Sequence, residues 1–104
     1  MSFGLTLSHV GIFVTDIARM TDFYTRFMGF VVSDRAPREG GEIVFLTRDP
    51  LEHHQFVLAS GRPAELPFSP INQLSFRVDG LATLRALYKG LKRESVEILG
   101  PITH

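Results

Sequence analysis

The sequence predicts an α+β fold built from two βαβββ units, the second of which is incomplete. The first observation is an internal repeat without gaps, in which Gln73 follows His9 by 73 − 9 = 64 positions. The second is that each copy opens with strand-like alternation and continues with helical spacing. The third is that the second copy reaches only His104, which corresponds to position 104 − 64 = 40 of the first. Self-similarity at a fixed period indicates a repeated structural unit, so it decides the predicted architecture.

Residues 5–15 are expected to form the first strand, because apolar and polar residues alternate along much of this segment. Val10 begins the series of positions expected to face the core. His9 and Phe13 share the opposite side of the strand, which makes them candidates for lining a pocket.

A helix is expected from Ile17 to Met28, because its apolar residues recur at helical spacing. Asp16 is a suitable N-cap, since its carboxylate can accept from the first free amides of a helix. Gly29 suits the left-handed position that ends one.

Three further strands complete the first unit, which spans residues 5–60. They are expected at residues 30–35, 42–48 and 54–59. Residues 35–41 carry Pro and Gly and are expected to form the turn between the first two of them.

We interpret residues 1–104 as a single domain in which residues 61–70 connect the two repeats. This connector contains three prolines, which resist helix and central strand, and it is too apolar to be a flexible tether. The partial second unit then covers residues 71–104.

The second unit is expected to repeat the opening of the first. A strand is predicted at residues 71–78, a helix capped by Asp79 at residues 81–92, and a strand at residues 96–99. The helical positions that match between the copies are Leu81, Leu84, Leu87, Tyr88 and Leu91, which fall on Ile17, Met20, Phe23, Tyr24 and Phe27.

The composition excludes several classes of function. The formal charge is +0 and the pI is about 6.9, so no basic field attracts nucleic acid or anionic lipid. The chain has no cysteine, which excludes disulfides, thiolate metal sites and a cysteine nucleophile. It lacks an apolar run of about 20 residues, so membrane insertion is not expected and the predicted location is the cytoplasm.

The opening residues carry a resemblance to a known family. The motifs are Leu7-Ser8-His9-Val10 and Val14-Thr15-Asp16, followed by Phe23-Tyr24 and Met28-Gly29-Phe30. A βαβββ unit used twice, with a histidine on its first strand, resembles the vicinal oxygen chelate superfamily. This superfamily includes glyoxalase I, extradiol dioxygenases and bleomycin resistance proteins, and the resemblance covers essentially the whole chain. It implies two sheets that form a shared cavity with a divalent metal.

The resemblance places candidate metal ligands at His9 and Gln73. His9 falls on the ligand position of the first strand; otherwise it would be a hydrogen-bonded structural histidine. Gln73 stands where related dioxygenases carry a second histidine, so it is either a weaker ligand or a cavity residue that binds no metal. The carboxylate expected on the fourth strand of the second unit would lie beyond His104. Fe(II) is the first expectation, Mn(II), Zn(II) and Ni(II) are alternatives, and a chain without metal is a further one.

Two other histidines match catalytic positions of extradiol dioxygenases. His54, the second residue of the His53-His54 pair, is the candidate for acid–base steps on the substrate. His53 is interpreted as structural. His104 resembles a histidine that follows the second helix in the sequence of these dioxygenases and reaches the substrate or oxygen pocket.

At these residues the resemblance implies an extradiol-dioxygenase-like metalloprotein acting on a catechol-type aromatic diol. No glutamate occurs between His53 and Ser60, which disfavours the glyoxalase or epimerase type. The alternative from another class is a metal-free binding protein of the bleomycin-resistance type. A small aromatic ligand is the expected partner. A homodimer is also expected, because the missing strands would leave an exposed sheet edge.

Overall fold

The computed structural model describes residues 4–98, which divide into two compact units after Leu66. This division falls within the connector expected at residues 61–70. Each unit is described by itself. Within the described range, neither helix has the length and apolar character needed to cross a membrane.

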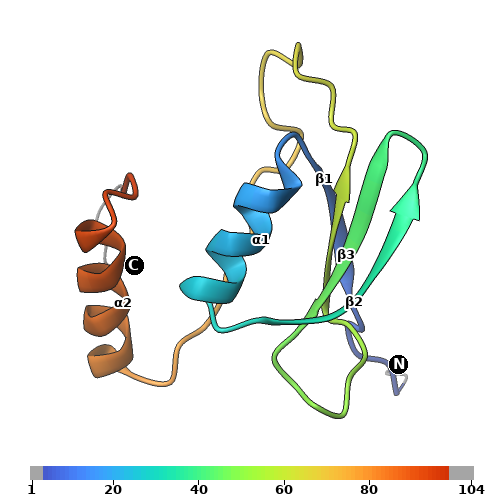
Figure 1. Cartoon of the computed structure of the whole chain (residues 1–104). Helices are drawn as coiled ribbons and strands as arrows, with labels where there is room; N and C mark the ends of the chain where they lie inside the picture. Colours follow the sequence, from blue (N-terminus) through green and yellow to red (C-terminus); the bar gives the residue numbers. More distant parts are fainter. Residues whose placement is uncertain (1–3, 99–104) are drawn as a thin grey trace. The chain divides into compact units, whose positions relative to one another are not determined.

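The first unit contains a four-stranded mixed sheet (Figure 1). Its strands are β1 (Val10–Val14), β2 (Val31–Arg38), β3 (Gly41–Thr47) and β4 (Phe56–Ser60). Their order across the sheet is β1-β4-β3-β2, with β1 parallel to β4 and the other pairs antiparallel. With α1 between β1 and β2, the unit has the predicted strand–helix–strand–strand–strand order.

Both ends of helix α1 (Ile17–Arg26) are defined by hydrogen bonds between residues close in sequence. The Asp16 carboxylate accepts a hydrogen bond from the Arg19 amide at 3.0 Å, which confirms the predicted N-cap. Gly29 has φ 73°, and the Phe30 amide donates back to the Tyr24 carbonyl at 3.1 Å. These are features of a helix that ends through a left-handed glycine, as expected.

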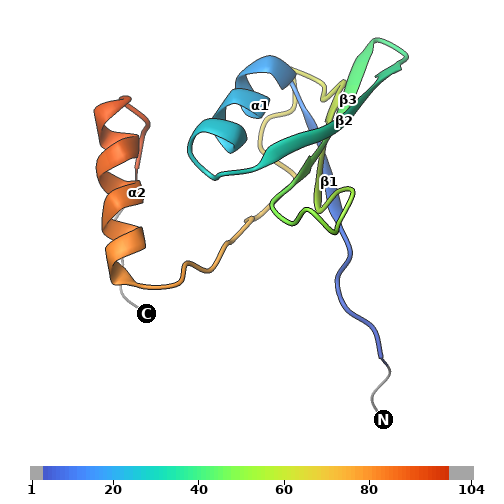
Figure 2. The same ribbon diagram turned by 60° about the horizontal axis from the view of Figure 1, so that its bottom comes forward.

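Helix α1 lies against one face of the sheet, as Figures 1 and 2 show from two directions, and the core of this unit lies between them. The ring of Tyr24 packs edge-on against Phe56 of β4, with the ring centroids 4.7 Å apart, and Phe30 contacts both rings. Leu46 and Leu58 are fully buried next to them. Burial of these side chains is the main stabilising contribution to the unit.

Strand β2 is longer than the sequence predicts. It continues through Pro37 to Arg38, so the turn predicted for residues 35–41 is wrong over its first half. Pro37 is tolerated because β2 is an edge strand, where a missing amide donor need not break the ladder. The strand also contains a register irregularity between Val32 and Asp34.

The second unit contains one helix, α2 (Leu81–Arg93), among its described residues. It begins 81 − 17 = 64 positions after α1, as the repeat predicts. The N-cap is Gly80, so the prediction that Asp79 caps the helix is wrong. The Asp79 carboxylate instead accepts from the hydroxyl of Thr83, and Gly80, whose backbone is extended, occupies the N-cap position.

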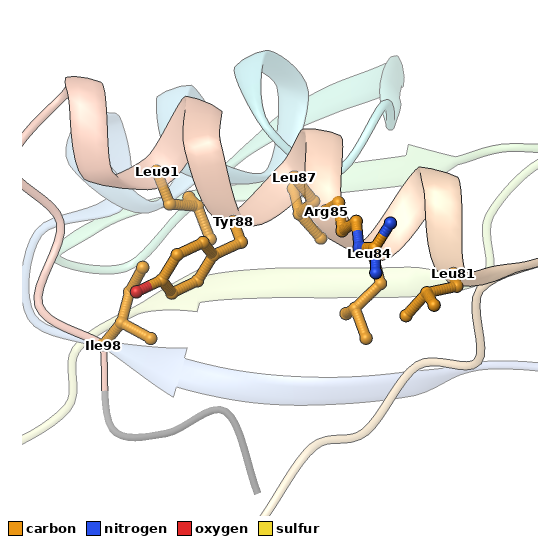
Figure 3. Close-up of a pocket in the computed structure, with 7 residues that line it drawn as sticks. All are labelled: Leu81, Leu84, Arg85, Leu87, Tyr88, Leu91 and Ile98. Atoms are coloured by element: carbon orange, nitrogen blue, oxygen red, sulfur yellow. The ribbon is translucent and has the colours of Figure 1, made fainter.

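The strands predicted for the second unit do not form in its described part. Residues 71–78 and 96–98 have no strand pairing, and Leu99 lies outside the described residues. A strand is stabilised by hydrogen bonds to a neighbour, and no strand pairs with either segment in the described part of this unit. Helix α2 nevertheless keeps its apolar face, which lines a groove of about 360 Å³ (Figure 3). The groove is lined by Leu81, Leu84, Arg85, Leu87, Tyr88, Leu91 and Ile98.

Candidate functional site

The candidate site lies on the face of the first unit's sheet that is turned away from α1, here called the open face. Side chains alternate between the faces of a strand, so Phe56 and Leu58 point toward α1 while Val57 points away. Cross-strand neighbours share a face, and the partners of Val57 are Gly11 and Phe45. The apolar side chains on the open face of β1, β3 and β4 are Phe13, Ile43, Phe45, Val57 and Ala59. Phe13 is 55% exposed there.

His9 and His54 meet at one edge of the open face because β1 and β4 are parallel. Each histidine shortly precedes its strand, and the register pairs Val10 with Phe56. The Val10 amide donates to the carbonyl of Gln55 at 3.2 Å, which ties the two strand entrances together. As a result, the imidazole rings of His9 and His54 lie edge to face with centroids 4.3 Å apart.

The ring of Phe45 provides an apolar wall for this edge. Its centroid lies 5.1 Å from that of His54 and 5.6 Å from that of His53. Farther along the same face, the Arg38 guanidinium carbon lies 5.2 Å from the centroid of Phe13. The open face therefore presents aromatic surface between two imidazoles at one edge and a guanidinium toward the other.

His53 and Asp34 lie next to the pair His9 and His54, and the four residues form one cluster. Of the four, the sequence predicts a chemical role only for His9 and His54. The Nδ1 atoms of His53 and His54 are 2.8 Å apart, and His53 Nε2 lies 3.6 Å from the Asp34 carboxylate. The adjacent pair His53-His54 was a visible signal in the sequence. Asp34 carried no comparable signal, because it reaches the cluster only through the irregularity of β2.

The other two predicted site residues, Gln73 and His104, belong to the second half of the chain. Gln73 lies in the second unit, where it is exposed on a segment without strand pairing. His104 lies outside the described residues. Their predicted roles stay predictions, as do those of His9 and His54.

The described residues do not complete a metal site. Between residues 4 and 98, no group of three or more histidine, aspartate or glutamate side chains is arranged to hold an ion. His9 and His54 supply two neighbouring imidazoles, which suit Fe, Ni, Cu or Zn, but among the described residues no further histidine, aspartate or glutamate completes a set of three with them.

The surroundings lower the pKa of His54 below its usual value. Partial burial disfavours the charged imidazolium, and the positive charges of His9 and His53 add to this effect, while Glu52 opposes it. His54 is therefore favoured in its neutral form, the form that can accept a proton or a hydrogen bond.

Because the pKa of His54 is lower in the folded than in the unfolded chain, the free energy of unfolding depends on pH. Because the folded pKa lies below the unfolded value near 6.5, the unfolded chain binds a proton first as the pH falls. We expect the free energy of unfolding to decrease below about pH 6.5, and to decrease less steeply in His54→Gln. Urea titrations of both proteins from about pH 8 to about pH 5 test this. Equal pH dependence in the two proteins would contradict it.

A family model described as the Glyoxalase/Bleomycin resistance protein/Dioxygenase superfamily matches residues 6–104. A search of curated proteins finds no match.

Proposed function

Because this chain belongs to the glyoxalase/bleomycin resistance protein/dioxygenase superfamily, we propose that the open face of its first unit binds a small aromatic diol. The observation that carries the proposal is the pair of imidazoles, His9 and His54, with ring centroids 4.3 Å apart beside the ring of Phe45. Two neighbouring imidazoles match the two neighbouring hydroxyls of a catechol-type ring.

The chemistry of the face supports an aromatic ligand. Phe13 and Phe45 offer edges and faces to a flat ring, and such pairs contribute about 0.5–1.5 kcal/mol beyond the burial of their area. A neutral imidazole nitrogen can accept a hydrogen bond from a phenolic hydroxyl. The lowered pKa of His54 favours this neutral form.

Isothermal titration calorimetry with catechol tests this binding. Resorcinol serves as the control ligand, because its two hydroxyls are not on neighbouring carbons. We expect catechol to bind more tightly than resorcinol. We also expect His54→Ala to weaken catechol binding by up to about tenfold, the value of one hydrogen bond.

Arg19→Ala is the control variant, because Arg19 is exposed on α1, which covers the other face of the sheet. It should leave catechol affinity unchanged. Equal affinities for catechol and resorcinol, or equal losses in His54→Ala and Arg19→Ala, would refute the proposal.

A second candidate function is metal-assisted ring cleavage of the same diol, as in extradiol dioxygenases. The juxtaposition of His9 and His54 supports it, since imidazoles bind Fe(II) and related ions. The ligand set would need a residue from outside the cluster, for which Gln73 is the candidate given by the repeat. Catechol binding that survives a chelator, with no yellow ring-fission product after anaerobic Fe(II) loading and exposure to oxygen, would favour the metal-free binding protein.

A further inference from the structure

We propose that Asp34 and His53 are positioning residues that fix the tautomer of His54, so that its Nε2 lone pair is presented to the ligand. The inference rests on the proposed function, in which His54 accepts from a ligand hydroxyl. It assigns a role to two residues that the sequence left as structural or unremarked.

The argument begins with the orientation of the Asp34 carboxylate. Its Oδ1 atom accepts a hydrogen bond from the Arg35 amide at 2.8 Å, which leaves Oδ2 to face His53 Nε2 at 3.6 Å. The register irregularity between Val32 and Asp34 places Asp34 opposite Phe45, on the open face. A bulge of this kind changes the direction in which a side chain points.

An ionised carboxylate can only accept, so it favours a proton on the nitrogen that faces it, His53 Nε2. In neutral His53 the Nδ1 atom then carries a lone pair. The two Nδ1 atoms of His53 and His54 are 2.8 Å apart, a separation that requires one proton between them. That proton must come from His54 Nδ1, which leaves a lone pair on His54 Nε2.

Packing restricts the rings that make these contacts. Phe45 contacts both His53 and His54, and His9 lies edge to face against His54. His9 itself is less constrained, because its Nδ1 faces the Ser8 hydroxyl at 3.0 Å, which can donate or accept. The geometry therefore selects one tautomer for His54 and leaves both open for His9.

Two-bond ¹H–¹⁵N correlation spectra of the free protein at about pH 8 test the inference, since they distinguish the two nitrogens of each neutral imidazole. We expect a protonated Nδ1 and an unprotonated Nε2 for His54. In Asp34→Asn, the amide oxygen should keep the bond from the Arg35 amide, so the partly positive NH₂ group would face His53 Nε2 and favour a lone pair on that nitrogen. The expected result is a reversed tautomer for both His53 and His54.

Asp22→Asn is the matched control, because Asp22 pairs with Arg26 at 3.4 Å on α1 and not with the cluster. It should leave the His54 tautomer unchanged. His53→Ala removes the acceptor and should give a mixture of tautomers. A protonated Nε2 on His54 in the unmodified protein, or equal tautomer ratios in Asp34→Asn and Asp22→Asn, would overturn the inference.

The spectra do not depend on ligand binding, so the two proposals can fail separately. Absence of catechol binding with the expected tautomers would refute the function and leave the positioning role intact. If both hold, Asp34→Asn should weaken catechol binding by up to about tenfold, because His54 would then offer a donor where the hydroxyl needs an acceptor.

Discussion

Replacing Leu58 with alanine is expected to lower the free energy of unfolding of the first unit by about 2–5 kcal/mol. Leu58 lies at the centre of β4, is 0% exposed, and faces α1 between strands β1 and β3. Shortening it would remove buried methyl groups and leave a cavity that the close-packed neighbours can fill only in part. Urea denaturation followed by far-ultraviolet circular dichroism measures the loss.

Leu51→Ala provides a control of identical chemistry in the same unit. Leu51 is 92% exposed in the segment between β3 and β4, so its truncation should change the free energy of unfolding by no more than about 0.5 kcal/mol. Similar losses in the two variants would show that the helix face of the sheet is not the core of this unit.

Gly41→Ala is expected to destabilise the same unit by about 2–4 kcal/mol through a steric conflict with Ser60. The Ser60 hydroxyl accepts from the Glu42 amide at 2.8 Å and donates to the Glu42 carbonyl at 3.1 Å, which joins the end of β4 to the start of β3. A β-carbon on Gly41 would fall on this hydroxyl. Ser60 would have to rotate away and lose both hydrogen bonds.

Two further variants separate this conflict from a general effect of replacing glycine. Gly4→Ala should be nearly neutral, because a β-carbon there meets no atom within 4 Å. Adding Ser60→Gly to Gly41→Ala should restore about 1–3 kcal/mol relative to the sum of the single losses. Strict additivity of the two substitutions, measured by the same denaturation method, would contradict the steric explanation.

The features that the sequence predicts well are those decided by neighbouring residues. Asp16 caps α1 and Gly29 ends it because a carboxylate and a residue without a β-carbon have the required local chemistry. The two helices start 81 − 17 = 64 positions apart, which is the period of the repeat. The same local rules predict a turn at Pro37, which instead lies in β2, because an edge strand tolerates a residue without an amide donor.

The features that the sequence alone does not predict depend on residues that are far apart in the chain. Residues 71–78 have the alternation of a strand, yet alternation alone does not supply a neighbour to pair with. Asp34 joins His53 only because a bulge in β2 changes which face it occupies. The resemblance identified His9 and His54 as candidates, but their contact follows from the parallel register of β1 and β4.

That parallel register also has a consequence for how the unit folds. The β2–β3 hairpin closes a short loop, whereas pairing Val10 with Phe56 joins residues 56 − 10 = 46 positions apart. Contacts between distant residues form more slowly because the entropy of closing the intervening chain must be lost first. We therefore expect the two imidazoles to come together in a late step of folding, so that a ligand requiring both of them stabilises only the fully assembled sheet.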